Sequence, residues 1–508
     1  MKNCRECQQE IGSSPKVCPN CGARRPTKTN WKEKGFEYKS KTTIMGIPLL
    51  HISLKYGPYW RPLPAKGIIS IGQVGIGLIN ISQFGIGVLS ISQFTIAFWA
   101  LAQIAIAYSL IAQIGLFVYS GYGQMVWSIN ELYNIYTCEP SEKYFYHIPE
   151  NIDDGLLSGS LDEVNINGVL LEEVVNKIRC GRYKEIHSIL IVKDNKLVFE
   201  EYFKGHKFQW DAPKHHGELV NWSRSMPHHV HSVTKSITST CIGIAIDKGF
   251  IKSVHESIFD YLPEHQHLNT DGKDKITIEH LLTMTSGLEW DEWGAELSSS
   301  ANDIIEIWFQ DDDPISYVLK RPLVHEPGIH FTYSGGNMIV LGEIIRYATK
   351  MNIAEFSGKY LFEPLGIDSF DWWHRFKNGV FETGGGLNMT PRDMAKIGVT
   401  FLNNGVWNGK QIISKQWVEK SAISFHCNKG INIPDTDQEN HGYAYSWWTK
   451  TFSNSGKSIN MFNAGGWGGQ KIIVFPEENT VVVFTGGNYT SKTIIFKILE
   501  KYIIPATD

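Results

Sequence analysis

The most regular pattern along the chain is an uncharged stretch from Gly67 to Asn130, in which a bulky aliphatic residue recurs every five positions. Small residues follow most of these positions, and a glutamine recurs every ten. A five-residue period does not keep one face on an α-helix with 3.6 residues per turn, so it favours a β-solenoid of stacked coils. The two series are Ile71, Ile76, Ile81, Ile86, Ile91, Ile96, Leu101, Ile106, Ile111 and Leu116, and Gln73, Gln83, Gln93, Gln103 and Gln113.

In such a solenoid we expect the isoleucines to fill the interior, the small residues to allow tight corners and the glutamines to form a hydrogen-bonded ladder. The stretch resembles pentapeptide-repeat-like β-solenoids and the Gly-Ile-rich repeats that follow zinc ribbons in bacterial proteins. Insertion into a membrane as hairpins stays open, because about twenty apolar residues span a bilayer. Outward aromatic residues such as Phe84, Phe94 and Trp99 leave contact with lipid or with protein open as well.

Beyond the repeat, the hydrophobic pattern predicts two pairs of strands at the ends of one domain, from about Tyr136 to Asp508. Residues 188–192 and 196–202 are joined by the Asp194-Asn195 turn. Residues 471–475 and 480–484 form the second pair, and the segments between the pairs are mostly helical. Strands at both ends of a helical middle indicate an antiparallel sheet flanked by helices, an α/β or α+β sandwich with a helical subdomain.

Four cysteines near the N-terminus form two C-x-x-C knuckles, which can place four thiolates tetrahedrally around one structural Zn²⁺. The ligands are Cys4, Cys7, Cys18 and Cys21. A module this small cannot bury a core and would depend on the metal. It resembles bacterial zinc-ribbon heads, and a redox-active cysteine cluster is the alternative. We therefore expect a zinc ribbon over 1–25, a basic linker over 26–44 and the repeat segment over 45–130, ahead of the domain over 136–508.

Composition narrows the function further. A chain of 508 residues is too long for one ordinary domain, and a net charge of −4 with a pI near 6.5 makes nucleic acid an unexpected partner. Cys138, Cys180, Cys241 and Cys427 are scattered and do not form a disulfide framework. The N-terminus lacks the apolar core of a signal peptide. We expect a cytoplasmic protein, with membrane association through the repeat left open.

The candidate chemistry begins at Ser232, which precedes an apolar helical stretch, with Lys235 one turn later on the same helix face. A serine hydroxyl is a weak nucleophile until a neighbouring base takes its proton, and desolvation favours the neutral form of a lysine. Free N–H groups at a helix start can stabilise an oxyanion. The alternative is that Ser232 is only a helix N-cap followed by a solvated lysine.

Four further motifs follow in order. They are Thr277-Ile278-Glu279-His280-Leu281-Leu282-Thr283-Met284-Thr285-Ser286-Gly287-Leu288; Pro327-Gly328-Ile329-His330-Phe331-Thr332-Tyr333-Ser334-Gly335-Gly336-Asn337; Gly384-Gly385-Gly386-Leu387-Asn388-Met389-Thr390-Pro391-Arg392-Asp393-Met394-Ala395; and Gly465-Gly466-Trp467-Gly468-Gly469-Gln470.

Together these motifs resemble the serine β-lactamase-related family of class C β-lactamases, D-alanyl-D-alanine peptidases, related esterases and 6-aminohexanoate-oligomer hydrolases. The resemblance covers the chain from about Tyr136 onward and implies an α/β sandwich facing a helical subdomain. It implies that Ser232 is the nucleophile, Lys235 its partner and Tyr333 a proton shuttle whose phenol ionises beside the lysine. The oxyanion would lie between the Ser232 N–H and an N–H at Ala464 or Gly465. No cofactor is expected for this catalysis.

Two departures from the family pattern bear on the substrate. The Tyr-x-Asn motif has Gly335 where asparagine is expected, with Asn337 two residues on as a candidate replacement. The Lys-Thr-Gly strand motif is replaced by Asn463-Ala464-Gly465-Gly466, which carries no cation for a substrate carboxylate. The Gly-Gly-Gln ending is closer to the esterase and aminohexanoate-hydrolase branch.

The first hypothesis is therefore a serine hydrolase that cleaves a small ester or amide through an acyl-enzyme at Ser232. A catalytically weak penicillin-binding-like sensor or scaffold is the second hypothesis, favoured by the two departures. A membrane-anchored β-lactamase or peptidase homologue is the third, and it depends on whether the repeat inserts in lipid.

Overall fold

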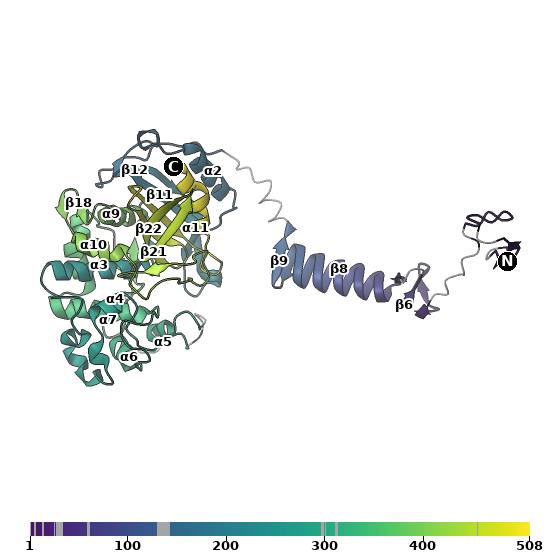
Figure 1. Ribbon diagram of the computed structural model, residues 1–508, viewed down its shortest axis with the longest axis horizontal. Helices are drawn as coiled ribbons and strands as arrows, with labels where there is room; N and C mark the ends of the chain where they lie inside the picture. The colour runs from purple at the N-terminus through teal and green to yellow at the C-terminus, as the bar shows by residue number, and fades with distance from the viewer. Residues whose placement is uncertain are drawn as a thin grey trace. The chain divides into compact units, whose positions relative to one another are not determined.

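The computed structural model describes residues 2–4, 7–12, 15–24, 26, 34–57, 61–129, 143–295, 299, 301–309, 313–454 and 456–507. The chain divides into two compact units, Met1–Cys138 and Glu139–Asp508, which are described separately below. Figure 1 labels their helices and strands.

An eight-stranded sheet forms the centre of the second unit, and in its middle β11 (Ile186–Lys193) lies beside β24 (Thr480–Gly486), its last strand in sequence. Only β10 and β12 pair in parallel, and the other neighbours are antiparallel. Both predicted hairpins are confirmed, and Asp194 and Asn195 turn the first one with positive φ. In spatial order the strands are β10 (Leu157–Ser158), β12 (Lys196–Tyr202), β11 (Ile186–Lys193), β24 (Thr480–Gly486), β23 (Gln470–Phe475), β22 (Lys457–Gly466), β21 (Trp448–Asn454) and β20 (Gly442–Tyr443).

Helices cover both faces of this sheet because its central strands are apolar on both sides. Successive side chains of a strand point to opposite faces, and Ile472 and Val474 enter one core while Ile473 enters the other. The Ile473 face is covered by α2 (Gly168–Arg179) and α11 (Ile495–Ile498), and the opposite face by α9 (Pro391–Leu402) and α3 (Val233–Asp247). The predicted α/β sandwich is confirmed.

The expected helical subdomain packs against α3. Its central helix α7 (Gly335–Thr349) contacts α3, α4 (Ile278–Leu282) and α6 (Pro314–Lys320). The smaller helices α5 (Asp303–Phe309) and α8 (Ile353–Ser357) complete it, and α10 (Lys415–Ala422) lies near β22. The core therefore runs from the sheet through α3 into the helices, and the start of α3 lies where the two parts meet (Figure 1).

The repeat in the first unit is one 54-residue run of extended backbone, β8 (Ile69–Tyr122), which winds in successive coils (Figure 1). It pairs in parallel with β6 (Leu50–Tyr56) and β7 (Ala65–Lys66) near its start and with β9 (Met125–Ser128) near its end. Side chains ten residues apart lie over one another: the Phe84 and Phe94 rings stack with centroids 5.1 Å apart. We name residues 67–128 the coil stack.

The expected interior of isoleucines is wrong, because the aliphatic series faces outward. Ile86, Ile96 and Ile111 are 55%, 57% and 58% exposed, while the inward positions hold Gly, Ser, Asn, Thr or Ala in the first coils. The first coils are too narrow for larger side chains, since a Cβ added to Gly85 would collide with the Asn80 side chain, whereas Leu110 is buried inside a later coil.

The hydrogen-bonded ladder inside the coil stack is also not the predicted one. Asn80 Nδ2 donates to Ser90 Oγ at 2.9 Å, and Thr95 Oγ1 donates to the same oxygen at 2.7 Å. The glutamines from Gln83 onward face outward, and no hydrogen bond joins one glutamine of the series to the next among the described residues.

The structure also bears on the predicted linker and on the scattered cysteines. Within the predicted linker, residues 34–39 form β3 (Lys34–Lys39), which pairs antiparallel with β6, whereas residues 27–33 lie outside the described residues. One of the four scattered cysteines, Cys180, is disulfide-bonded. No helix in the part of the chain that the structure describes is long and apolar enough to cross a membrane.

Arg392, from the third motif, ties α9 to the first hairpin, and it yields a stability prediction. Its buried guanidinium donates to both Glu200 oxygens at 2.7 and 2.6 Å and to Asp154 at 3.1 Å. Removing one partner of a buried ion pair leaves an uncompensated charge, so Arg392→Met should lower the free energy of unfolding by about 3–5 kcal/mol. The matched control is Lys207→Met at the exposed pair with Glu218, where we expect less than about 1 kcal/mol. Equal shifts of the two calorimetric unfolding midpoints would contradict this assignment.

Candidate active site

Ser232 lies at the start of α3, directly after a residue with strained backbone. His231 has φ 46°, in the left-handed region that β-carbon-bearing residues rarely adopt. The imidazole of His231 is buried against Phe208, Trp467 and Tyr489, whose packing holds this turn. Ser232 occupies the N-cap position, but its side chain makes no capping hydrogen bond and Lys235 is buried, so a capping serine with a solvated lysine does not describe the pair.

Lys235 is buried beneath Ser232. Its Nζ donates to Ser232 Oγ at 3.1 Å and to the Gly384 carbonyl at 2.9 Å, and the residue is 3% exposed. The glycine motif at 384–386 therefore serves to hold the lysine. The Ser232 and Lys235 side chains meet on one helix face, as the three-residue spacing predicts.

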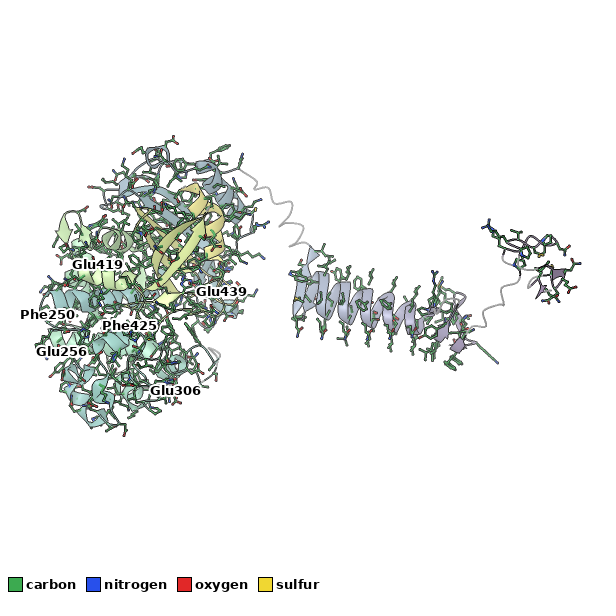
Figure 2. All side chains as sticks on the ribbon, viewed as in Figure 1. Phe250, Glu256, Glu306, Glu419, Phe425 and Glu439 are labelled. Carbon is green, nitrogen blue, oxygen red and sulfur yellow. The ribbon has the colours of Figure 1, made fainter. Side chains whose placement is uncertain are left out.

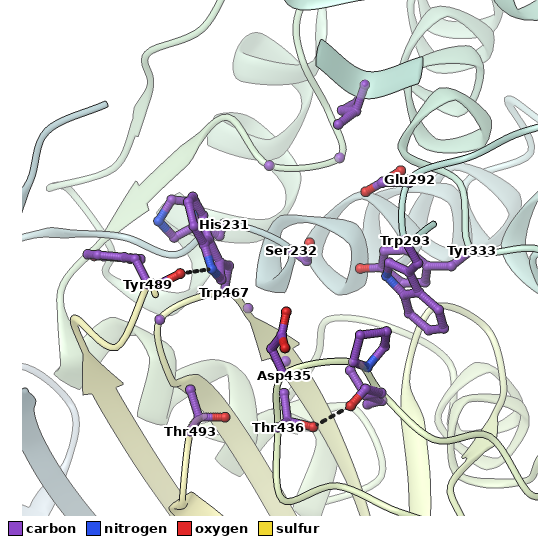
Figure 3. Close-up of a pocket in the computed structure, with 18 of the residues that line it drawn as sticks. His231, Ser232, Glu292, Trp293, Tyr333, Asp435, Thr436, Trp467, Tyr489 and Thr493 are labelled. Atoms are coloured by element: carbon purple, nitrogen blue, oxygen red, sulfur yellow. Dashed lines mark hydrogen bonds between the residues drawn. The ribbon is translucent and has the colours of Figure 1, made fainter. Parts of the chain in front are cut away.

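Tyr333 comes from the loop before α7 and lies beside Ser232 in the cavity (Figure 3). Lys235 Nζ is 4.8 Å from the centroid of its ring, and the Trp293 ring stacks on it at 4.8 Å. Burial raises the pKa of Tyr333, the nearby Glu292 carboxylate adds to this, and a hydrogen bond with Ser232 acts in the opposite direction. The expectation of a readily ionised phenol is therefore wrong, since burial and Glu292 favour its protonated form.

Sequence reasoning missed Glu292. Its Oε1 lies 3.9 Å from Lys235 Nζ, and its Oε2 accepts hydrogen bonds from the Gly335 N–H at 2.6 Å and from Trp290 Nε1 at 3.0 Å. A Cβ on Gly335 would lie 3.1 Å from that oxygen and 2.7 Å from Ile304 Cδ1. The missing asparagine of the Tyr-x-Asn motif thus makes room for a carboxylate, and the glycine itself was the signal.

Glu382 is a second carboxyl group near the lysine, and the sequence analysis missed it as well. It is 1% exposed and its Oε1 accepts a hydrogen bond from the Gly384 N–H at 2.8 Å. Burial raises its pKa to about 7, although the Lys235 ammonium opposes the shift. A carboxyl group with this pKa can exchange a proton with its surroundings near neutral pH.

These residues line a cavity of about 390 Å³. Ser232 lies in its centre, Glu292, Trp293 and Tyr333 on one side, and His231 and Trp467 on the other (Figure 3). Trp210 and Trp308 add further aromatic wall. A cavity of this size, with aromatic walls and polar groups that converge on it, is typical of a site for a small molecule.

The three tentative substrate residues differ in whether they line the cavity. Gly465 lines the cavity, and Gly466 beside it approaches the Val230 carbonyl so closely that a Cβ would collide with it. Ala464 is fully buried and is not part of the lining. Asn337 is buried inside α7, where its N–H donates to Ser334 Oγ, and it does not line the cavity either. The oxyanion assignment therefore stays a prediction, with Gly465 and its neighbour Gly466 as candidates.

Lys471 supplies the cation that the strand motif lacks. It lies on β23 opposite Gly465 of β22, and the absence of a Gly465 side chain leaves room for its amine in the cavity lining. Its Nζ donates to Gln438 Oε1 at 2.8 Å and to Asn463 Oδ1 at 3.3 Å, and no salt bridge pairs it among the described residues. Burial lowers the pKa of Lys471 to about 7, and Asp437 acts in the opposite direction. The strand motif itself carries no cation, and the neighbouring strand brings an amine to this edge of the cavity.

In the first unit, the four N-terminal cysteines come together. Their sulfur atoms all lie within 4.8 Å of one another, with Cys4 and Cys21 3.6 Å apart and Cys7 and Cys18 3.8 Å apart. A tetrahedral site with Zn–S distances of about 2.3 Å has S···S edges of about 3.8 Å. The four thiols are coupled, because hydrogen bonding lowers the pKa of Cys7 while its cysteine neighbours raise that of Cys21. The sulfur geometry fits a zinc ion.

Comparison with known proteins identifies the family of the second unit. Residues 187–491, more than half of the chain, match the Beta-lactamase family model. The chain therefore belongs to the β-lactamase family, which confirms the resemblance and the expected class, a β-lactamase-related serine hydrolase.

Among curated proteins, the 6-aminohexanoate-dimer hydrolase of Paenarthrobacter ureafaciens is 26% identical over 263 residues, which cover 50% of this chain and 65% of that enzyme. Protein flp of Staphylococcus aureus strain MW2 is 28% identical over 179 residues, 35% of this chain and 33% of that protein. The chain thus spans less than two thirds of each of these relatives.

Solved structures share the fold. A family VIII carboxylesterase superposes with a TM-score of 0.51 at 14% identity, covering 71% of this chain and all of the esterase. A penicillin-binding protein homologue from Caulobacter crescentus gives 0.52 at 14% identity, covering 72% of this chain and all of that homologue.

The geometry predicts that, of the two serines in the cavity lining, only Ser232 reacts with a fluorophosphonate. Ser491 also lines the cavity, but its hydroxyl bonds Asn488 and has no lysine partner, so it is the matched control. We expect Ser232→Ala to abolish labelling and Ser491→Ala to leave it within about twofold of the wild-type rate. Labelling that survives in Ser232→Ala would show that another residue is the nucleophile.

Proposed function

We propose that this protein hydrolyses a small amide or ester that carries an anionic group, through an acyl-enzyme at Ser232. The observation that carries the proposal is the buried Lys235 amine, 3.1 Å from the Ser232 hydroxyl at the centre of an aromatic cavity. Hydroxyl, amine and phenol within reach of one another are the groups that two-step acyl transfer requires.

In the proposed mechanism, the neutral Lys235 amine takes the Ser232 proton as the oxygen attacks the substrate carbonyl. The Ser232 N–H at the start of α3 and an N–H of β22 stabilise the oxyanion. The protonated Tyr333 phenol gives its proton to the leaving group, and the Lys235 ammonium returns a proton to the phenolate. Water then attacks the acyl-enzyme, with the same groups acting in reverse, and releases the acid.

Lys471 is the basis for expecting an anionic substrate. Its amine lies in the cavity wall among neutral amides and close to the Phe496 ring, 5.5 Å from the ring centroid. A buried ammonium without a carboxylate partner is poorly compensated, so a carboxylate in the cavity would gain both attraction and hydrogen bonds from it. Both β-lactams and linear amides with a free carboxylate have the required chemistry.

We predict that Lys471→Met selectively impairs anionic substrates. Relative to wild type, kcat/KM for a p-nitrophenyl ester with a free carboxylate should fall about 10- to 100-fold, as expected for a lost charge-assisted hydrogen bond. The ester without the carboxylate should be hydrolysed within about twofold of the wild-type rate, which also checks the fold.

The same preference should depend on pH. Because the pKa of Lys471 is lowered to about 7, the cation is present below that pH and is lost as the pH rises. In wild type, the ratio of kcat/KM values for the anionic over the neutral ester should fall across pH 7, and in Lys471→Met it should be flat. If Lys471→Met hydrolysed the anionic and the neutral ester with equally reduced kcat/KM, anion binding by this lysine would be contradicted.

The sensor or scaffold hypothesis keeps one specific observation in its favour. The Glu292 carboxylate, 3.9 Å from Lys235 Nζ, attracts an ammonium with about 4 kcal/mol at an effective dielectric constant near 20. A lysine held in the charged form is a poor base, and turnover would then be slow. Such a site would bind a ligand or keep it as a long-lived acyl-enzyme.

Glu292→Gln separates the two functions. The amide oxygen can still accept the Gly335 hydrogen bond, but the negative charge beside the Lys235 amine is gone. We predict that the rate of ester hydrolysis at neutral pH rises severalfold in the variant, because the charge that holds the ammonium has been removed. An unchanged rate in the variant, together with a wild type that acylates without turnover, would favour the sensor.

We also propose that residues 1–25 are a zinc ribbon with one structural Zn²⁺ and that the coil stack is a β-solenoid. The sulfur distances support the first proposal, and the ten-residue pairing along β8 supports the second.

The zinc proposal predicts about one zinc per chain in metal analysis of the purified protein. Cys7→Ser should reduce this to near zero, whereas Cys427→Ser, at a cysteine in the second unit, should not. Equal zinc content in the two variants would contradict the site.

A further inference from the structure

The outside of the coil stack is apolar on more than one side. The aliphatic series forms outward rows, and the outward positions between them carry Leu78, Phe84, Leu89, Phe94 and Trp99, all at least 41% exposed. No charged residue occurs from Gly67 to Asn130. Figure 2 shows the side chains projecting outward along the whole stack. The single regular polar row, the glutamines, is uncharged.

Polar groups lie inside the first coils instead, and alanine and leucine fill the later ones. Ser70, Asn80 and Ser90 are fully buried, and Asn80 and Ser90 bond one another across layers. This distribution is the reverse of that in a protein surrounded by water, where contiguous exposed apolar patches rarely exceed a few hundred Å². A protein partner docking on one side would leave the other apolar rows in water, whereas lipid covers every side at once.

A coil stack also meets the backbone requirement of a bilayer, where each N–H and C=O needs a partner within the protein. Each layer can pair with the layers above and below. At the first coil Ala65 of β7 pairs with Gly75, and at the last coil Leu116 pairs with Trp127 of β9. The unpaired edges are therefore confined to the two ends of the stack.

The height of the coil stack also matches the hydrocarbon thickness of a bilayer. β8 has 54 residues and β9 adds a further layer, which at ten residues per layer makes about six layers. With strands about 4.8 Å apart, the stack is roughly 29 Å high, close to the 30 Å hydrocarbon thickness of a bilayer.

The charges on the two flanks differ strongly. Residues 24–66 contain ten Lys or Arg, whereas residues 131–154 contain one, Lys143. Segments rich in Lys and Arg next to a membrane crossing stay on the cytoplasmic side. The chain enters the stack at the first coil and leaves it at the last, so the two flanks belong to opposite ends.

We propose that the coil stack crosses a lipid bilayer, with residues before 67 on the cytoplasmic side and the Glu139–Asp508 unit on the other. The disulfide at Cys180 is an independent observation in the same direction, because disulfides persist in oxidising compartments outside the cytosol. The N-terminal cysteine cluster, which needs reduced thiolates, lies on the reducing side in this arrangement.

The first test uses the full chain in bacterial cells, with one epitope tag at each end. We expect the protein to stay in the membrane pellet after a carbonate wash. Protease added to intact spheroplasts should remove the C-terminal tag and spare the N-terminal tag. Extraction of the wild type by carbonate, or equal protection of both tags, would overturn the proposal. A soluble oligomer of defined size would show that the apolar rows bind other copies of the chain instead.

The second test places charge on the outside of the stack. Ile91→Lys with Ile96→Lys, at residues 47% and 57% exposed, should move the protein to the carbonate supernatant, because each central lysine disfavours insertion by about a hundredfold. The matched control is Val324→Lys with Ile329→Lys, at residues 50% and 60% exposed in the second unit, which should stay in the pellet. The same fractionation for both pairs would contradict the proposal, and the tag experiment does not depend on how either variant folds.

Discussion

The candidate site depends on one interaction, the burial of the Lys235 amine between the Ser232 hydroxyl and the Gly384 carbonyl. A lysine is stable in such a position only if its donors have acceptors, and the glycine segment at 384–386 supplies one through its backbone. The strained turn at His231 and the aromatic rings around it then place Ser232 at the cavity floor. Tyr333, Glu292 and Glu382 surround the amine, so the protonation of the whole cluster is coupled through it.

Much of the second unit could be predicted from the sequence because its signals are local. The hairpin at Asp194-Asn195 and the spacing of Ser232 and Lys235 each lie within a few residues. Strand and helix geometry then determines that the two strands pair and that the two side chains share one helix face. The residues that the sequence analysis missed come from segments far apart in the chain. Lys471 reaches the cavity only because β23 pairs with β22 at Gly465, and Glu292 reaches Lys235 only because Gly335 has no side chain.

The repeat illustrates a different limit. A five-residue period predicts stacking, but it does not reveal which positions point inward. The usual rule that apolar residues are inside led to the wrong assignment, since the first coils are too narrow for isoleucine and hold serine, asparagine and glycine. Once the outside is known to be apolar, uncharged and about as high as a bilayer is thick, the same repeat becomes a candidate membrane crossing rather than a water-exposed spacer.

The most direct test of the central claim is to trap and locate the acyl group. The protein would be mixed with p-nitrophenyl acetate, quenched in acid within the first turnover, digested and mapped by mass spectrometry. The account predicts one acetyl group on the peptide that contains Ser232, and its loss in Lys235→Met. Acetylation of a different residue, or acylation of Ser232 at the wild-type rate without the Lys235 amine, would contradict the assignment of this pair as nucleophile and base.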